Sequence, residues 1–397
     1  MPSAGRMINV ADMREAARCR LPKAVFDYLD GGADDEITMR DNSNAFAELR
    51  FRPRSGVDTG QLDMSVDVLG NKIELPVMLG PVGYSRLFHP RGELAGTLAA
   101  GRAGTIFCVP TLSGYGLEEL KTKSTQPLWY QLYPIGGRKI VEAALARAAA
   151  AGYAALLVTI DTAKSGNRER DLRNGVSALM GSSVVRKVRY VPNLMAHPKW
   201  VAGFLLDRGN GKLDNIMIPG QGPMTLAQLS DLPDEMDHWI ITWEDLEWIR
   251  KIWKGPIVIK GIQTDDDARR AVNEGVQGIV VSNHGGRQLD SVAGSLRVLP
   301  SVVSAVGDQI PVFMDSGIRR GGDVIKALCL GAKAVFIGRA YIYGLSAFGD
   351  AGIDRVMEIL KADISRNMLL LGAKSIKDLN ASFVECSPSW PKSLMAD

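Results

Sequence analysis

Eight short runs of apolar, β-branched-rich residues recur along this chain and limit the folds open to it. Helix-like segments follow most of the runs, for example Arg138–Ala151, Asp265–Glu274 and Gly322–Leu330. Strands that alternate with helices at this spacing indicate a parallel sheet. Eight such units predict an α/β fold, a (β/α)8 TIM barrel, which typically needs about 250 residues; an open doubly wound sheet is the alternative. The runs are Pro76–Leu79, Thr105–Val109, Leu128–Leu132, Ala155–Ile160, Ile257–Lys260, Gly278–Val281, Val312–Met314 and Ala334–Ile337.

Two regions lie outside the regular units of the predicted barrel. Residues 1–75 precede the first strand, and within them Leu21–Leu29, with proline near its start and glycines after it, predicts a helix. The segment 166–253, after the fourth strand, is far longer than an ordinary connection, and segments of this length are usually functional lids or disordered stretches. We therefore predict one domain over 1–397, with a helical extension at 1–75 and a barrel at 76–385 that contains the insertion.

One part of the insertion, Val184–Lys212, is basic and carries large apolar side chains. It holds six cations against the single acid Asp207, and Trp200, Phe204 and the pair Leu205-Leu206 lie among them. A segment of this composition can lie on an anionic membrane surface. The alternative is a solvated lid that packs on the barrel. The cations are Arg186, Lys187, Arg189, Lys199, Arg208 and Lys212.

Composition excludes several other classes of protein. The net charge of +3 is too small to predict binding to nucleic acid. The four cysteines are scattered without a C-x-x-C pair, which predicts reduced thiols and neither a disulfide framework nor a metal site. No signal peptide is visible, and no uncharged apolar run reaches the roughly 18 residues that cross a bilayer. We expect a cytoplasmic protein, peripheral on the inner face of the membrane if the basic segment binds lipid.

Chemically active residues gather directly after the predicted strands. After Gly278–Val281 comes the motif Ser282–Asp290, in which His284 and Arg287 stand three residues apart among glycines. A base beside an anion binder suits removal of a proton next to a carboxylate. An ordinary surface or core histidine is the alternative reading. Polar or glycine residues follow the other strands too, and active sites of TIM barrels lie at that end, so we expect one shared ligand site.

The last two strands carry the residues of a phosphate site. Asp315–Gly322 and Gly338-Arg339 combine glycine amides with arginines, whose planar guanidinium groups match a phosphate with two hydrogen bonds. The loops after the seventh and eighth strands are the usual phosphate site of such barrels. The chain lacks a P-loop and lacks a G-x-G-x-x-G after its first strand. A mononucleotide such as FMN therefore fits better than a nucleoside triphosphate or a dinucleotide.

Together these motifs resemble the FMN-dependent α-hydroxy acid dehydrogenase and oxidase family over nearly the whole chain. The segments Leu246–Arg250 and Pro81–Gly83 are most similar to its bacterial L-lactate dehydrogenase branch, with the mandelate dehydrogenases nearby. No heme-binding domain precedes the barrel, so the resemblance is not to the fused flavocytochrome form. It rests on Ser282–Asp290, Lys260, Asp315–Arg320 and Gly338-Arg339, and it extends from Leu21-Pro22-Lys23 to Gly372–Ile376.

The resemblance implies a set of catalytic and substrate-binding residues. His284 would be the base that removes a proton from the substrate, and Asp161 would orient it and stabilise its imidazolium. Arg287 and Tyr28 would hold the substrate carboxylate, and Tyr133 would contact the hydroxyl group. Arg168 would support the anionic end, a choice that rests on the family's Arg-Glu pattern. Plainer readings remain for a helix-capping Asp161, a core Tyr28, and a solvated Arg168 or Arg170.

The resemblance also implies how the chain holds FMN. Lys260 would sit beside the N1–O2 edge of the flavin ring, although it could be an ordinary lysine at the barrel mouth. Pro81, Val82 and Gly83 would line one side of the ring by backbone, and Asp315 would bind the ribityl hydroxyls. Further ring or ribityl contacts would come from Gln131, Thr159 and Ser282, and phosphate contacts from Gly317, Arg319, Gly338 and Arg339.

This chain departs from the family pattern at three places near the predicted pocket. Pro110-Thr111 stands where the family often has a serine that contacts the flavin; Thr111 would replace that contact or the contact would be lost. Leu112 stands where glycolate oxidases carry tryptophan and mandelate dehydrogenases a small residue. Tyr84-Ser85-Arg86 is an unusual pocket stretch. The size of the substrate is therefore open.

We predict FMN-dependent oxidation of an (S)-2-hydroxy acid, lactate-like or mandelate-like, to the 2-oxo acid. Gly83 favours a dehydrogenase that passes electrons to a quinone or another acceptor, since oxidase-like relatives tend to have alanine there. The main alternative is an oxidase that uses O2 and yields hydrogen peroxide. An FMN-dependent isomerase is more remote, because it would not need His284, Arg287 and Asp161. The family resemblance also implies a homo-oligomer, a tetramer.

Overall fold

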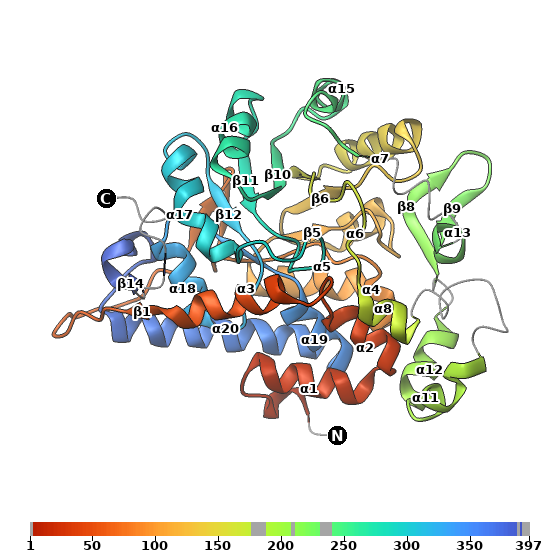
Figure 1. The fold of residues 1–397 in the computed structure, drawn as a ribbon, viewed down its shortest axis with the longest axis horizontal. Coiled ribbons are helices and arrows are strands. Elements are labelled where there is room, and N and C mark those ends of the chain that lie inside the picture. The colour runs from red at the N-terminus through yellow and green to blue at the C-terminus, as the bar shows by residue number, and fades with distance from the viewer. Residues whose placement is uncertain (1–2, 176–187, 208–210, 231–239, 387–389, 391–397) are drawn as a thin grey trace.

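The computed structural model describes residues 3–175, 188–207, 211–230, 240–386 and 390 (Figure 1). Its centre is a closed barrel of eight parallel strands, which confirms the predicted fold and excludes the open doubly wound sheet. Seven strands lie inside the predicted runs, and the fifth, β10, continues two residues further. The strands are β4 (Val77–Leu79), β5 (Phe107–Val109), β6 (Leu128–Leu132), β7 (Ala155–Thr159), β10 (Ile257–Ile262), β11 (Gly278–Val281), β12 (Val312–Met314) and β13 (Val335–Ile337).

The barrel interior is filled by aromatic side chains. The strands are buried almost throughout, because helices cover the outside and side chains fill the inside. Trp129, Phe313 and Phe336 pack edge to face with ring centroids 5.8–6.2 Å apart. Phe336 also lines the cavity above, so this aromatic layer forms part of the floor of the site.

Helices surround the barrel as the alternating pattern predicts (Figure 1). Three predicted helices match within one residue at each end: α7 (Arg138–Ala150), α16 (Asp265–Asn273) and α18 (Gly321–Cys329). Thr264 caps α16 by accepting from the Asp267 amide. The other helices of the ring and its flank are α4 (Ser85–Phe88), α5 (Gly92–Ala103), α6 (Leu117–Lys123), α15 (Asp245–Ile252), α17 (Ser295–Val306), α19 (Arg339–Phe348) and α20 (Asp350–Leu371).

The segment before the barrel contains strands as well as the predicted helices. The helix expected near Leu21–Leu29 is α2 (Lys23–Asp30), with Pro22 before it and Gly31 after it. β1 (Leu49–Phe51) pairs antiparallel with β14 (Val384–Cys386) near the other end of the chain, and the sequence analysis predicted neither strand. The remaining elements are η1 (Ala4–Arg6), α1 (Val10–Arg20), α3 (Ile37–Glu48), the hairpin β2 (Val66–Val68) and β3 (Asn71–Ile73), η3 (Ile376–Asp378) and η4 (Ala381–Phe383).

The insertion between β7 and β10 is a mixture of helices and a hairpin. Its last helix, α15, packs on α7, as the ordinary helix of a barrel unit would, so the extra part ends before residue 245. None of the described helices is long and apolar enough to cross a membrane. The other elements are α8 (Glu169–Asn174), η2 (Val188–Tyr190), α11 (Val191–Met195), α12 (Pro198–Leu206), β8 (Lys212–Ile218), β9 (Gly222–Thr225) and α13 (Leu226–Ser230).

The basic segment of the insertion partly packs on the barrel and partly faces outward. The side chain of Trp200 is buried and donates its indole N–H to the Leu87 carbonyl oxygen, 2.9 Å away. Leu205 and Leu206, at the end of the same helix α12, are exposed by 75% and 79%. The predicted cations Arg186, Lys187 and Arg208 lie outside the described residues. One side of α12 thus packs on the barrel while another is exposed, and whether the exposed side meets a membrane stays a prediction.

Candidate active site

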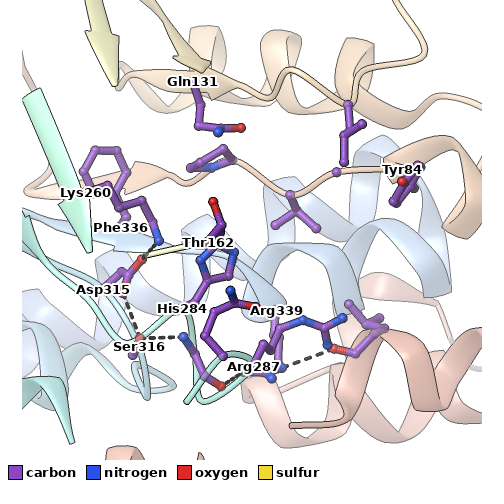
Figure 2. A pocket seen from close by; sticks show the side chains of 18 of the residues that line it. Tyr84, Gln131, Thr162, Lys260, His284, Arg287, Asp315, Ser316, Phe336 and Arg339 are labelled. Carbon is purple, nitrogen blue, oxygen red and sulfur yellow. Dashed lines mark hydrogen bonds and ion pairs between the residues drawn. The ribbon is translucent and has the colours of Figure 1, made fainter. Parts of the chain in front are cut away.

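A cavity of about 260 Å³ opens at the carboxyl ends of the barrel strands (Figure 2). This is where a TIM barrel places its active site, because the loops after all eight strands converge there. Most of the residues predicted for the site line it. They are Tyr28, Pro81, Val82, Gly83, Gln131, Tyr133, Arg168, Lys260, His284, Arg287, Asp315, Gly317, Arg319, Gly338 and Arg339.

His284 lies between a carboxylate and a phenol. Its Nδ1 atom is 3.0 Å from Oδ1 of Asp161, and its Nε2 atom is 3.0 Å from the Tyr133 hydroxyl. The loop after β11 turns sharply, so His284 has a φ of +58°, a left-handed conformation that is unfavourable for a residue with a side chain. Its amide donates to Oγ of Ser282, 3.1 Å away, which fixes the turn. The turn directs the imidazole into the cavity.

The surroundings hold His284 neutral and Asp161 ionised. Burial lowers the pKa of His284 below its ordinary value of 6.5, and the neighbouring Asp161 only partly opposes this effect. Burial works to raise the pKa of Asp161, but its interaction with His284 and the charge of Lys260 outweigh this effect, and the pKa falls. The pair can therefore accept a proton at Nε2 while the carboxylate stabilises the imidazolium that results.

Asp161, in the loop after β7, packs against Gly261 and is thereby placed beside His284. Gly261, in β10, has a φ of +110°. A Cβ atom there would lie 2.6 Å from the Cβ of Asp161, closer than such atoms approach. The strand register shifts between Lys260 and Ile262, so the backbone bends at this glycine. The bend makes room for the carboxylate under the imidazole.

Arg287 and Arg339 are held by the end of helix α2. Arg287 donates to the carbonyl oxygens of Tyr28 and Gly31, and Arg339 donates to those of Leu29, Gly31 and Gly285, at 2.7–3.2 Å. Carbonyl groups at a helix C-terminus have no partner within the helix and attract cations. A segment far away in the sequence thus positions both guanidinium groups.

The partners of Arg287 do not neutralise its charge. Burial lowers its pKa to about 9, and the positive charge of Arg168 adds to the effect. Its guanidinium group donates to two backbone carbonyl oxygens, and its guanidinium carbon lies 5.1 Å from the centre of the Tyr28 ring. A buried cation of this kind favours an anion beside it. Arg287 and His284 both line the cavity, so such an anion would lie near the imidazole.

Lys260 forms a buried polar group with two residues from neighbouring strand ends. Its Nζ atom is 2.9 Å from Oγ of Ser282 and 3.3 Å from a carboxylate oxygen of Asp315. Burial works to lower the pKa of Lys260, but the charges of Asp315 and Asp161 outweigh it and raise the pKa. Lys260 is therefore a fixed positive charge that lines the cavity, and Figure 2 shows it bonded to Asp315.

The other end of the cavity suits a phosphate. Gly317 has a φ of +81°, and a Cβ atom on it would lie 2.1 Å from the Asn42 carbonyl oxygen, so only glycine fits there. Arg319 and Arg339 both line this end, and α19 begins at Arg339 with its N-terminus at the cavity. Guanidinium groups and a helix N-terminus both bind phosphate. With Lys260 and Asp315 for the ring and ribityl parts, these residues fit FMN.

Four predicted site residues lie behind the cavity wall. Asp161 acts on the cavity through His284, and Ser282 through Lys260. The Thr111 hydroxyl donates to the Gln131 carbonyl oxygen and accepts from the Tyr133 amide, at 2.7 and 2.9 Å. The fourth residue is Thr159, whose Oγ1 is 3.2 Å from Nε2 of Gln131. Direct contact between Thr111 or Thr159 and a flavin stays a prediction.

The sequence analysis missed two residues that shape this site. Gln288 donates to the carbonyl oxygens of Asp161 and Lys164, at 3.0 and 2.9 Å, and so ties the loop after β7 to the His284 loop. Ser316, with a φ of +79°, accepts from the Gly285 amide and donates to Asp315. Both stand inside motifs that the sequence analysis identified, but the loops that they join are far apart in the chain.

Comparisons with known proteins agree with this geometry. The family model for FMN-dependent dehydrogenase matches residues 17–386. The chain is 38% identical over 379 residues to the (S)-mandelate dehydrogenase of Pseudomonas putida, with 96% of this chain and 94% of that protein covered. It is 40% identical over 383 residues to an L-lactate dehydrogenase of Alcaligenes faecalis, with 95% and 98% covered.

Solved structures are similar over the same extent. The crystal structure of the monotopic membrane protein (S)-mandelate dehydrogenase superimposes with a TM-score of 0.89 at 37% identity, covering 96% of this chain and all of that one. A mandelate oxidase superimposes with a TM-score of 0.78 at 34% identity, covering 96% and 98%. The chain thus belongs to the family of FMN-dependent dehydrogenases, an oxidoreductase of the lactate and mandelate dehydrogenase type.

Proposed function

We propose that this enzyme oxidises an (S)-2-hydroxy acid to the 2-oxo acid with His284 as the base. One observation carries the proposal: the imidazole of His284 lies between Asp161 and Tyr133, three residues from a buried arginine whose charge is not neutralised. A base at hydrogen-bond distance from an orienting carboxylate, next to an anion site, is the arrangement that this reaction needs. FMN, when bound, accepts the two electrons that leave C2 of the substrate.

Each residue around the substrate then has one task. Arg287 and Tyr28 bind the carboxylate, and Arg168 adds positive charge beside them. Tyr133 contacts the substrate hydroxyl; burial raises its pKa, so the phenol stays neutral and can donate. Nε2 of His284 takes a proton from the substrate, and Asp161 stabilises the imidazolium that forms. Lys260, Asp315, Arg319 and Arg339 hold the cofactor.

Anaerobic flavin reduction tests the proposed reaction. Purified enzyme is mixed with lactate, glycolate, mandelate or 4-hydroxymandelate without O2, and the loss of yellow flavin absorbance is followed. At least one (S)-2-hydroxy acid should bleach the flavin, while the matching alcohol without a carboxylate should not. Bleaching by none of the acids, with FMN bound, would show that the reaction class is wrong.

We further propose that the electrons pass to a quinone rather than to O2. Gly83 supports this choice, because oxidase-like relatives tend to have alanine at this position. A Cβ atom at Gly83 would lie 3.1 Å from Cβ of Leu112, so the wall has little room for that alanine. Stopped-flow mixing of reduced enzyme with a quinone analogue and with O2 compares the two acceptors. We expect fast reoxidation by the quinone analogue and slow reoxidation by O2. If O2 reoxidised the flavin faster than substrate reduced it, the enzyme would be an oxidase.

The insertion supplies a surface through which a membrane quinone could be reached. Exposed apolar side chains gather on η2, α11 and α12, and Lys199 is exposed beside them. Helices with an apolar face flanked by basic residues bind membrane surfaces. We propose that this surface binds anionic lipid, as the monotopic (S)-mandelate dehydrogenase binds membranes. The side chains are Val188, Val191, Met195, Leu205 and Leu206.

Cosedimentation with anionic vesicles tests the surface. The wild type should sediment with vesicles at low ionic strength and be released by salt, since part of the attraction is electrostatic. The double variant Leu205→Ser/Leu206→Ser should lose binding, whereas Leu370→Ser, at a leucine of α20 exposed by 68%, should keep it. Absence of wild-type binding at low salt would leave the insertion as a lid only.

The predicted tetramer is a separate question. Sedimentation velocity of the enzyme without vesicles would measure its oligomeric state.

A further inference from the structure

We infer that Tyr84 is a specificity residue that binds an oxygen atom at the far end of the substrate's R group. The preferred substrate would then be a 2-hydroxy acid with an apolar body that ends in a hydroxyl or similar group. This inference rests on the proposed function, because it requires a 2-hydroxy acid in the cavity. The unusual stretch Tyr84-Ser85-Arg86 has no part in the reaction described so far.

The backbone of Tyr84 is held in an unfavourable conformation. Three of the non-glycine residues with positive φ line the cavity: His284, Ser316 and Tyr84, whose φ is +60°. The first two belong to the catalytic and cofactor loops. Such conformations are unfavourable and persist where the surroundings enforce them, often at functional sites.

Hydrogen bonds on both sides fix the turn at Tyr84. Its amide donates to the Leu112 carbonyl oxygen, 3.0 Å away, and its own carbonyl accepts from the Leu87 amide, 2.8 Å away. The next amide, of Ser85, donates to the buried carboxylate of Glu93 at 3.2 Å. These three hydrogen bonds fix the turn, so the side chain of Tyr84 is held at the cavity that it lines.

The Tyr84 ring stands at the apolar end of the cavity. It lies across the cavity from Lys260 and Asp315 in Figure 2. Leu112 and Ile135 line the wall next to it and belong, with Leu213 and others of the insertion, to a second apolar cluster on which Tyr84 packs. The Tyr28 ring is 6.1 Å away on the other side. An apolar wall therefore covers one side of Tyr84, and the carboxylate-binding residue Tyr28 stands on the other, so the R group of a substrate would extend from Tyr28 along this wall.

The Tyr84 hydroxyl has no hydrogen-bond partner among the described residues, although it belongs to a cavity-lining side chain. The Tyr133 hydroxyl, by contrast, is 3.0 Å from His284. Burial raises the pKa of Tyr84, so the phenol stays protonated and can donate. A polar group enclosed by apolar walls favours a ligand with a matching acceptor and disfavours one that leaves it unpaired.

The test compares (S)-4-hydroxymandelate with (S)-mandelate in anaerobic flavin reduction. The ratio of their kcat/KM values should be well above one in the wild type and about tenfold lower in Tyr84→Phe, the effect of one neutral hydrogen bond. Tyr28→Phe, at the carboxylate end, should slow both substrates and leave the ratio unchanged. Because each ratio compares the same two substrates, electronic effects of the ring hydroxyl cancel between variants. The flavin spectrum checks that each variant is folded and loaded.

The kcat/KM ratios and the substrate panel separate failure of the Tyr84 assignment from failure of the proposed function. An unchanged ratio in Tyr84→Phe, or an equal loss with both substrates, would overturn the assignment, the second because Tyr84 would then bind the shared head of the substrate. Activity with lactate but with neither aryl acid would also overturn it. In these cases the proposed function stands. Failure of every 2-hydroxy acid would instead overturn the proposed function and this inference together.

Discussion

Gly261 and Asp161 are in such close contact that a Cβ atom on the glycine would lie 2.6 Å from the Cβ of the aspartate. The glycine also has a φ of +110°, which disfavours any side chain. Asp161 orients His284, so the contact links the backbone of β10 to the proposed base. The position of the carboxylate therefore depends on a residue that bears no functional group.

We predict that Gly261→Ala slows flavin reduction about a hundredfold, because a shift of about 1 Å in a catalytic group can cost that much. FMN should remain bound. Gly275→Ala is the matched control: its φ is +70°, but the nearest atom to its Cβ would be 3.9 Å away. Equal rates in the two variants would contradict the proposed dependence of the site on the contact between Gly261 and Asp161.

His284→Gln should bind FMN and fail to reduce it. Glutamine keeps a polar side chain but cannot take a proton, and general-base catalysis typically contributes about 10²–10⁴-fold. Stopped-flow absorbance under anaerobic conditions measures the rate directly. Reduction near the wild-type rate would remove His284 from the role of base and leave Tyr133 to be tested.

The pH profile should report His284. The base works in its neutral form, so activity is present above its pKa and lost as pH falls through it. Burial lowers this pKa, so the fall in kcat/KM should lie below pH 6.5, the ordinary value for histidine. Asp161→Asn removes the charge that opposes the lowering, so its acid limb should move to still lower pH while its plateau drops. A limb that moves upward would contradict the assigned pair.

Arg287→Lys should raise KM for 2-hydroxy acids strongly. Lysine keeps the charge, but it lacks the planar guanidinium that can bind a carboxylate and the α2 carbonyl groups at once. Discrimination against the neutral alcohols should weaken as well. Steady-state kinetics with an artificial electron acceptor measures both effects. An unchanged KM would move the carboxylate site to Arg168.

The ion pair between Arg86 and Asp207 should hold α12 on the barrel. Both side chains are largely buried, exposed by 12% and 8%, and Arg86 also donates to the Gly114 carbonyl oxygen. Asp207→Asn should destabilise this contact by roughly 3 kcal/mol, since it leaves a buried cation unpaired. Limited proteolysis should then cut near α12 faster. If Arg102→Ala, which breaks an exposed pair with Asp354, had the same effect, the buried pair would have no special role.

The sequence predicts much of the barrel and of its mouth because both depend on local patterns. A buried parallel strand is a continuous apolar run, so β6 and β11 can be read directly from the chain. The residues after each strand necessarily meet at one end of a closed barrel. This is why His284, Arg287 and Lys260 could be placed in one site without any structure.

Other features are decided by contacts between distant segments. Asp161 and His284 are separated by 123 positions, and their distance depends on the bend at Gly261. The strands β1 and β14 pair although they lie near opposite ends of the chain, and each is only three residues long, too short to give a pattern. Which side chains of α12 face outward is set by the docking of Trp200 and Asp207 on the barrel.

What the sequence determined by itself is thus the eight-stranded barrel, the end at which its chemistry lies and the family, because strand patterns and loop motifs are local. What only the tertiary structure decided is how the side chains meet. The C-terminus of α2 holds Arg287 and Arg339, and the turn at Tyr84 presents a phenol to the apolar end of the cavity. Those contacts join residues far apart in the chain, and their geometry follows from packing rather than from any pattern along the sequence.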